Sequence, residues 1–286
     1  MSAPVTQVVA HPLTGTAAHP IDARTGAPFD TRSYSLMKHG DLPAMHRLGD
    51  EVADALLADC PWLATDPRPV VLPVAYLVAP PACRYLADRV AARLTRARPD
   101  AARVIHVRKD AVTHIDYAAS SAQDRRADLA RIGFRLTEPV RGAVAVVVDD
   151  VRVTGLAEQV MLDLLQEAGI GQLVTAYVAT CDAELAADPS VEAALNHASV
   201  RSVHDMLPSV RRGDFVPTIR FLKRLLADPG IAQFLAQCPA QLVQRLRADA
   251  EATGPDFLAG YPAGTAALLA ESDRRPAVTP EGASHA

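Results

Sequence analysis

The sequence predicts an α/β fold in which helices cover both faces of a parallel sheet. Four nearly continuous apolar runs of strand length lie near residues 70, 104, 144 and 173, and segments with helical periodicity separate them. Hydrophobic residues make up 49% of the 286 residues and charged residues 22%, so the chain can bury a substantial core in one large domain or two small ones.

The N-terminal segment precedes this alternating pattern. Residues 1–30 are rich in Pro, Thr and Gly and have no sustained period, which predicts an irregular arm or cap. A helix is predicted within residues 33–60, where Asp41 can serve as the N-cap. The apolar face of that helix consists of Met45, Leu48, Val52, Leu56 and Leu57.

The core begins with an apolar strand at Val70–Val78. The Pro-Pro pair at 80–81 starts a predicted helix over residues 82–97, and β-branched residues predict a short strand at Arg103–Arg108. The polar segment that follows, of about thirty residues, is typical of a functional loop or a small insertion. The remaining core elements are a strand at Val144–Val148, a helix at Leu156–Gly169 with Gly169 as its C-cap, and a strand at Gln172–Cys181.

Beyond residue 185 the periodicity is helical only, most clearly over residues 218–227, 230–238 and 240–252. The last residues have the composition of a disordered tail. The predicted organisation is an N-terminal arm and cap at 1–58, a core at 59–185, a C-terminal helical extension at 186–271 and a tail at 272–286.

Composition excludes several classes of function. A net charge of −4 and a pI of about 6.1 argue against a nucleic-acid partner, and 5% aromatic residues argue against a base-stacking surface. No two of the four cysteines form a CxxC pair, so neither a zinc knuckle nor a redox motif is visible. No signal peptide is apparent, and no apolar run approaches the roughly 18 residues of a membrane span. We therefore expect a soluble, cytoplasmic protein with no membrane partner.

The stretch "AVAVVVDDVRVTG" carries the clearest chemical signal. It places Asp149 and Asp150 at the carboxyl end of a predicted strand, where ligands bind in parallel sheets. The turn at 151–155 leads into a helix N-terminus, whose backbone N–H groups can bind an anion. Two carboxylates beside an anion site suit a sugar phosphate, because its hydroxyl groups can donate to the carboxylates while its phosphate binds the turn.

Four other interpretations compete to explain the acidic pair. Asp149 could cap a turn while Asp150 is solvated. A Walker B strand requires a G-x-x-x-x-G-K-[ST] loop, which the chain lacks. The nearest string to a dinucleotide-binding fingerprint, "GIGQLV", follows a helix rather than a strand. A receiver-type phosphoacceptor site needs its acidic pair earlier in the chain. The first interpretation stays open.

This stretch resembles the motif with which type I phosphoribosyltransferases bind 5-phosphoribosyl 1-pyrophosphate (PRPP). The resemblance implies a phosphoribosyltransferase-type core, with Asp149 and Asp150 on the ribose hydroxyls and on Mg²⁺. It also implies that Val151, Arg152, Val153, Thr154 and Gly155 bind the 5′-phosphate. The chain departs from the family at Val153, Leu156 and Ala157, where a Thr, a small residue and a second Thr are usual, so phosphate binding would depend more on backbone amides.

Two further segments occupy positions that are functional in this family. Residues 73–76 take the place of the pyrophosphate loop, which implies that Ala75 and Tyr76 contact the ligand, although a plain buried strand is an equal alternative. The segment "RKDAVTH" resembles the mobile loop of orotate phosphoribosyltransferases. On that resemblance Arg108 and Lys109 neutralise the leaving pyrophosphate and His114 shuttles a proton, the alternative being a solvated histidine.

The chain is also similar to phosphoribosyltransferase-like proteins of bacterial tellurium-resistance-associated gene clusters. The shared features are "YSLMKHGD", "DYAASSAQDR", "VDDVRVTG" and the helical C-terminal part, over roughly residues 30 to 225. The resemblance implies that a cap over the site contains Tyr34, Ser35, Lys38 and Asp41. Lys38 and Asp41 could instead merely begin a helix.

Together these resemblances imply an enzyme that transfers ribose 5-phosphate from PRPP to a nitrogenous, base-like acceptor and releases pyrophosphate, with Mg²⁺ as cofactor and a homodimer as a possible assembly. The alternatives are a regulator that binds PRPP or a nucleotide without turnover, and a subunit of a biosynthetic complex.

Overall fold

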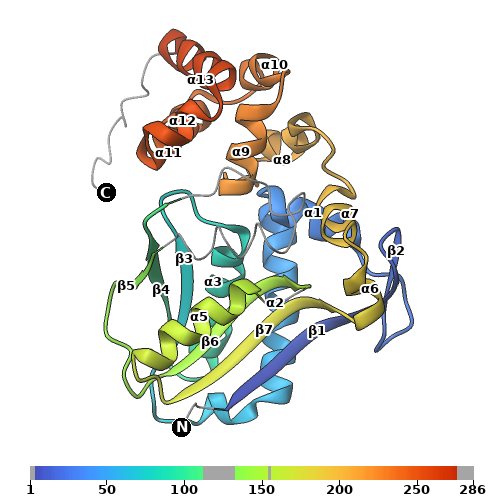
Figure 1. Cartoon of the computed structure of the whole chain (residues 1–286), viewed down its shortest axis with the longest axis vertical. Coiled ribbons are helices and arrows are strands. Elements are labelled where there is room, and N and C mark those ends of the chain that lie inside the picture. Colours follow the sequence, from blue (N-terminus) through green and yellow to red (C-terminus); the bar gives the residue numbers. More distant parts are fainter. Residues whose placement is uncertain (1–3, 112–132, 154–155, 276–286) are drawn as a thin grey trace, which may run out of the picture.

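A computed structural model describes residues 4–111, 133–153 and 156–275 (Figure 1). Within these residues the strands form one seven-stranded sheet with the order β2-β1-β7-β6-β3-β4-β5. The five inner strands are parallel, and β2 and β5 pair antiparallel at the two edges. The strands are β1 (Val5–Thr16), β2 (His19–Asp22), β3 (Val70–Tyr76), β4 (Ala102–Lys109), β5 (Phe134–Leu136), β6 (Val144–Arg152) and β7 (Gln172–Cys181). The predicted α/β fold with a parallel core is confirmed.

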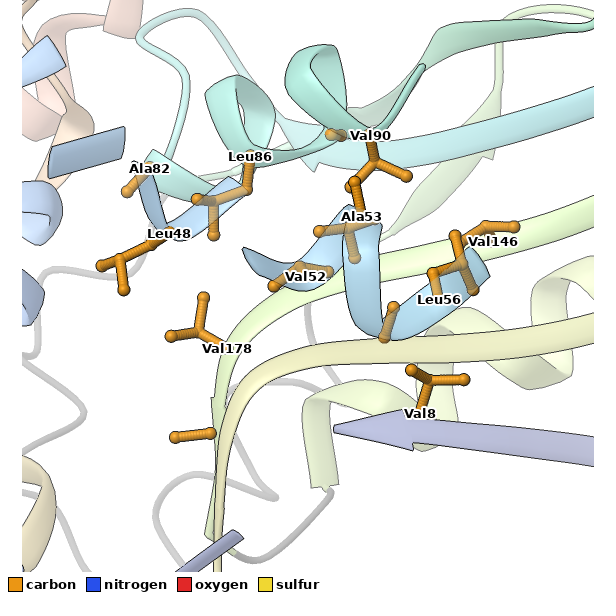
Figure 2. Packing of buried hydrophobic residues seen from close by; sticks show 14 of the residues in the cluster. Val8, Leu48, Val52, Ala53, Leu56, Ala82, Leu86, Val90, Val146 and Val178 are labelled. Atoms are coloured by element: carbon orange, nitrogen blue, oxygen red, sulfur yellow. The ribbon is translucent and has the colours of Figure 1, made fainter. Parts of the chain in front are cut away.

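Helices cover both faces of the sheet. On one face α2 (Leu42–Asp59) and α3 (Ala82–Ala97) pack in a single apolar cluster with β1, β3, β6 and β7 (Figures 1 and 2). On the other face α5 (Leu156–Glu167) packs with the alternate residues of β3, β4, β6 and β7. Along β6, Val146 therefore faces α2 and α3, whereas Val147 faces α5.

The direction in which successive strands extend the sheet reverses between β3 and β6. The connection from β3 runs through α3 to β4, and the connection from β6 runs through α5 on the opposite face to β7. These two neighbouring strands pair only at their first two residues, Val70–Val144 and Val71–Ala145, so their carboxyl ends are not joined by ladder hydrogen bonds. In open α/β sheets such a switch point is where ligands bind.

The prediction that residues 1–30 form an irregular arm is wrong for the described residues, 4–30. Strand β1 pairs in parallel with β7 over most of its length, and β2 folds back on β1. Only Val8 and Leu13 of β1 are fully buried, so the apolar pattern of this strand is too sparse to be read locally. The strand forms because β7 supplies a partner for its backbone, which is a long-range effect.

The helix expected after Asp41 is confirmed as α2, whose Ala44 N–H donates to the Asp41 carboxylate at 2.9 Å. A separate helix, α1 (Thr31–His39), precedes it and ends at Gly40, which has a φ of 115°. The chain therefore turns sharply between two helices that the sequence pattern did not separate.

The helical C-terminal extension is confirmed. Its longer helices pack around a second apolar cluster that includes Phe221, Leu225, Phe234 and Leu246. Helix α13 continues through Arg274, past the expected start of the tail at residue 272, and residues 276–286 lie outside the described part. The described helices are α6 (Ala183–Ala187), α7 (Val191–His197), α8 (Leu207–Arg212), α9 (Ile219–Ala227), α10 (Ile231–Ala236), α11 (Ala240–Thr253), α12 (Pro255–Ala259) and α13 (Pro262–Arg274), with short 3₁₀ turns at Pro61–Ala64 and Val203–Met206.

The predicted division at residues 58 and 185 stays a prediction. Of the polar segment after β4, residues 112–132 lie outside the described part, and the chain beyond them forms the edge strand β5. None of the helices in the described ranges has the length and apolar character of a transmembrane span.

Helix α1 is bonded to the helical extension. The Ser35 hydroxyl donates to the Asn196 carbonyl at 2.7 Å, and the Thr218 hydroxyl donates to the Lys38 carbonyl at 3.1 Å. Burial and the guanidinium of Arg224 hold the pKa of His39 well below its ordinary value, so this ring is neutral. Its Nδ1–H donates to the Ser35 carbonyl and its Nε2 accepts from Arg224, both at 2.8 Å. These bonds hold α1 between the sheet and the extension.

His11 of β1 lies between two carboxylates. We therefore expect its contribution to the free energy of unfolding to depend on pH. Its Nδ1 is 2.7 Å from Asp22 Oδ2 and its Nε2 is 3.0 Å from Glu51 Oε2. The hydrogen bond to Glu51 raises the pKa of His11 above 6.5, although burial opposes the shift. The protonated ring therefore stabilises the fold below about pH 6.5, and this contribution is lost as the pH rises through the folded-state pKa.

We expect His11→Gln to lower the free energy of unfolding most at about pH 6 and progressively less above it. Urea unfolding of both proteins over a pH series measures this difference. A difference that stays constant with pH would show that the imidazolium charge contributes nothing.

Candidate functional site

The acidic pair lies on β6 at the switch point of the sheet. The strand continues to Arg152, beyond the predicted end at Val148, because β7 pairs with it up to Arg152 and Thr180. Adjacent residues of a strand point to opposite faces. Asp150 therefore points toward α1, on the face of α2 and α3, and Asp149 points toward the face of α5. This separation is why two neighbouring carboxylates can be accommodated here.

Asp150 is surrounded by donors. Its Oδ1 accepts from the Tyr34 hydroxyl at 3.1 Å and from the Val151 N–H at 2.7 Å, and its Oδ2 forms an ion pair with Lys38 Nζ. Burial acts to raise the pKa of Asp150, but the charge and hydrogen bond of Lys38 outweigh it, and the pKa is lowered. Asp150 is therefore an anion at neutral pH.

Tyr34 is fully buried, and both burial and the charge of Asp150 raise its pKa well above 10. Its hydroxyl therefore keeps its proton and donates a hydrogen bond to the carboxylate. Tyr34 and Lys38 are four residues apart on α1, so both side chains lie on one face of the helix and reach the same aspartate.

Asp149 has the opposite electrostatic character. Burial, and after it the charge of Asp150, raise the pKa of Asp149 well above its ordinary value. Its Oδ1 accepts the backbone N–H of Asp150 at 2.9 Å, and its cross-strand neighbour on β7 is Tyr177. Asp150 is therefore ionised at neutral pH, whereas Asp149 protonates more readily.

Lys109 and Arg108 differ in their relation to the pair. Lys109 lies at the end of β4, where burial lowers its pKa and the charge of Asp149 partly opposes that shift. Its ammonium group lies 5.2 Å from the centroid of the Phe134 ring. Arg108 is exposed. The structure thus brings Lys109, but not Arg108, into the field of the acidic pair, together with Cys83 of α3, whose pKa burial and Asp149 raise well above its ordinary value.

The predicted phosphate turn is described only in part. Arg152 Nε donates to Glu158 Oε2 of α5 at 2.7 Å, and the Val151 N–H already donates to Asp150. Val151 and Val153 are half-buried against the apolar cluster of α2 and α3. Thr154 and Gly155 lie outside the described residues. Two of the groups that sequence reasoning assigned to phosphate are therefore engaged within the protein.

The remaining predicted residues fall in two places. Ala75 and Tyr76 are the last two residues of β3 rather than part of a loop, and the loop begins after them. The Tyr76 ring stacks on His106 with centroids 4.0 Å apart, and the Tyr76 carbonyl accepts from His106 Nε2 at 2.8 Å. His114 lies outside the described residues. Nothing in the described geometry brings Ala75 or Tyr76 into contact with the acidic pair.

The donors around Asp150 do not suit a divalent metal ion. Magnesium is bound by several oxygen ligands with little positive charge nearby, whereas both oxygens of Asp150 already accept hydrogen bonds and one faces an ammonium group. Among the described residues, no cluster of three or more His, Cys, Asp or Glu could hold a metal ion. Within the described ranges, no residue donates a hydrogen bond to Asp149 Oδ2, the remaining oxygen of the pair.

Sequence reasoning placed Tyr34 and Lys38 in a cap but did not foresee that both contact Asp150. Their spacing of four residues on a helix was the available signal. Arg220 of α9 was not assigned to the acidic pair. Its charge acts on both Asp150 and Tyr34, and it lies 4.0 Å from Glu192 of α7. The helical extension therefore contributes charge to the site.

A family model described as "PRTase ComF-like" matches residues 14–250 of the chain. No curated protein is significantly similar to it. Similar solved structures include a hypoxanthine-guanine phosphoribosyltransferase from Bacillus anthracis, with 13% identity, 49% of this chain and 68% of that chain covered, and a TM-score of 0.29. A hypoxanthine phosphoribosyltransferase from Staphylococcus aureus has 10% identity, coverages of 49% and 65%, and a TM-score of 0.32. The enzyme from Trypanosoma cruzi in complex with the product IMP has 14% identity, coverages of 48% and 62%, and a TM-score of 0.33.

Proposed function

Since the chain belongs to the PRTase ComF-like family, we propose that it binds PRPP at the acidic pair of β6 and transfers the phosphoribosyl group to a nitrogenous, base-like acceptor. One observation carries this proposal: Asp150 is held as an anion by Lys38 and Tyr34 at the switch point of a parallel sheet. A preorganised carboxylate at this place suits a hydroxyl group of a ribose.

The charges of the site fit the proposed chemistry. Cleavage of the bond between C1 and pyrophosphate gives the ribose ring positive character, which an anionic Asp150 stabilises. Negative charge develops on the leaving pyrophosphate, and Lys109 at the end of β4 is a cation near the pair. Asp149, with its raised pKa, can exchange a proton near neutral pH. Each group thereby has a role that its surroundings support.

We propose that Mg²⁺ takes part only as an ion bound to PRPP. The donors around Asp150 do not fit it, so we assign no step to a metal ion on this carboxylate. The oxygen atoms of a pyrophosphate group are themselves good ligands for Mg²⁺, and the ion would enter bound to the substrate.

Binding without turnover is the second candidate, and the loop after β3 favours it. Residues 77–81, "LVAPP", contain neither a glycine nor a basic residue, and the two prolines have no N–H to donate to a pyrophosphate oxygen. A protein that binds the ribose phosphate tightly but binds pyrophosphate weakly would act as a sensor of PRPP or of a nucleotide.

Calorimetry followed by a pyrophosphate-release assay separates these candidates. We expect PRPP with Mg²⁺ to bind, and pyrophosphate to be released when the correct base is present in a panel of nitrogen heterocycles. Binding with no release across the panel supports the sensor. Absence of PRPP binding contradicts both candidates, provided that a melting curve shows the protein to be folded.

A further inference from the structure

The ion pair between Lys38 and Asp150 joins two segments that are far apart in the chain. Both side chains are nearly buried, with 13% and 11% of their surfaces exposed. A buried pair of this kind is costly to separate, because either partner alone would be an uncompensated charge. The ammonium group of Lys38 therefore stays paired with Asp150 in the folded protein.

The position of Lys38 is set by the rest of the molecule. Its backbone carbonyl accepts from Thr218 at the start of α9, and the next residue, His39, is bonded to Arg224 of the same helix. On the preceding turn, the Ser35 hydroxyl is bonded to α7. Because α1 is held on several sides, the ammonium group is delivered to Asp150 without a large loss of conformational freedom on ligand binding.

Asp150 has little capacity left for a metal ion. A carboxylate has about four lone-pair sites, and the Tyr34 hydroxyl, the Val151 N–H and the Lys38 ammonium already use three of them. What remains suits a single hydroxyl group of a ligand. A divalent ion at the same oxygen would also stand next to a positive charge in a poorly solvated site, where repulsion is strong.

We propose that Lys38 is a resident cation of the acidic pair, whose ammonium group takes on Asp150 the place that a divalent metal ion would otherwise need. Ribose phosphate then binds to Asp150 without a metal ion on this carboxylate. This inference deepens the proposed function and rests on it for the identity of the ligand, but the exclusion of the metal ion can be tested without that ligand.

The first test titrates Mn²⁺, a paramagnetic substitute for Mg²⁺, and follows the free ion by electron paramagnetic resonance. We expect no binding to the wild-type protein at the pair and one ion per chain in Lys38→Met, whose side chain has similar length and no charge. The site should disappear again in the double variant Lys38→Met/Asp150→Asn. Lys38→Arg, which keeps the charge, should behave as wild type.

Two results of this titration would overturn the inference. One is a Mn²⁺ site in the wild-type protein that Asp150→Asn abolishes. The other is a folded Lys38→Met protein that gains no site. Circular dichroism of every variant establishes that it is folded. Lys38→Arg tests whether a substitution at this position changes Mn²⁺ binding when the ion pair with Asp150 is retained.

The second test uses ribose 5-phosphate, which has the diol and the phosphate but no pyrophosphate to chelate a metal ion. We expect its affinity for the wild-type protein, measured by calorimetry, to change less than about threefold between EDTA and Mg²⁺. In Lys38→Met the affinity in EDTA should fall about tenfold, and Mg²⁺ should restore much of the loss. A wild-type affinity that depends strongly on Mg²⁺ contradicts the inference.

The two tests fail separately. If no variant binds ribose 5-phosphate under any condition while the Mn²⁺ titration gives the expected pattern, the proposed function is wrong and the role of Lys38 as resident cation stands. If ribose 5-phosphate binds only with Mg²⁺, the proposed function stands and the role of Lys38 is wrong.

Discussion

Asp150→Asn is expected to weaken PRPP binding by about 10- to 150-fold, because a hydrogen bond to a charged group contributes about 1.5–3 kcal/mol and one ribose hydroxyl depends on this carboxylate. The amide keeps one oxygen that can accept from Tyr34 and from the Val151 N–H, so the local backbone is supported. The charge that neutralises Lys38 is lost, and the melting temperature should fall while the protein stays folded. Calorimetry with PRPP and Mg²⁺, together with far-UV circular dichroism, measures both effects.

Asp163→Asn is the matched control for this variant. Asp163 is exposed on α5, and Gln159 is its one hydrogen-bond donor within the described part of the chain, so its substitution removes the same charge away from the site. Its affinity for PRPP should equal that of the wild type. If Asp150→Asn also binds PRPP normally, the acidic pair is structural and does not bind the ribose.

Gly40→Ala is expected to lower the free energy of unfolding by about 2–5 kcal/mol. Gly40 ends α1 with a φ of 115°, where a side chain costs roughly 1–2 kcal/mol. A Cβ atom here would also overlap the carbonyl oxygen of Val216 and lie 2.8 Å from the Phe215 ring, and such overpacking costs about 1–3 kcal/mol more. Urea denaturation followed by circular dichroism measures the change.

Gly213→Ala separates the two causes. Gly213 ends α8 with a φ of 76°, but a Cβ atom added there meets no atom within 4 Å. This variant should therefore lose only the backbone part, about 1–2 kcal/mol. If both variants are destabilised equally, the close approach of Val216 to Gly40 is not a constraint on the fold.

The core could be predicted from the sequence because its strands and helices carry their own periodicity. The apolar runs of β3, β6 and β7 and the helix α3 are visible in a short window of residues. Strand β1 could not be found in this way, since its interior includes His11 and Pro12 and only two of its residues are fully buried. Its identity as a strand depends on β7, which lies more than 150 residues later in the chain.

The candidate site could likewise be predicted only where a local motif marks it. The acidic pair follows from a local motif, Asp149 and Asp150 after an apolar strand. The contacts of Asp150 with Tyr34 and Lys38 span 116 and 112 residues of sequence, and no local pattern reports such a distance. The hydrogen bond of Arg152 to Glu158 likewise depends on how the turn folds onto α5, and no local pattern in the sequence predicts it.

Helix α1 has two sets of contacts, and they make ligand binding and the folding of the C-terminal helices linked equilibria. Tyr34 and Lys38 meet the carboxylate, whereas Ser35 and His39 meet α7 and α9. Any ligand that binds more tightly to the ordered α1 must by linkage raise the free energy of any unfolding of the extension that also releases α1. Amide hydrogens in the extension, far from the reacting atoms, would then exchange more slowly with solvent when the ribose site is filled. The extension is in this sense part of the binding thermodynamics of the site.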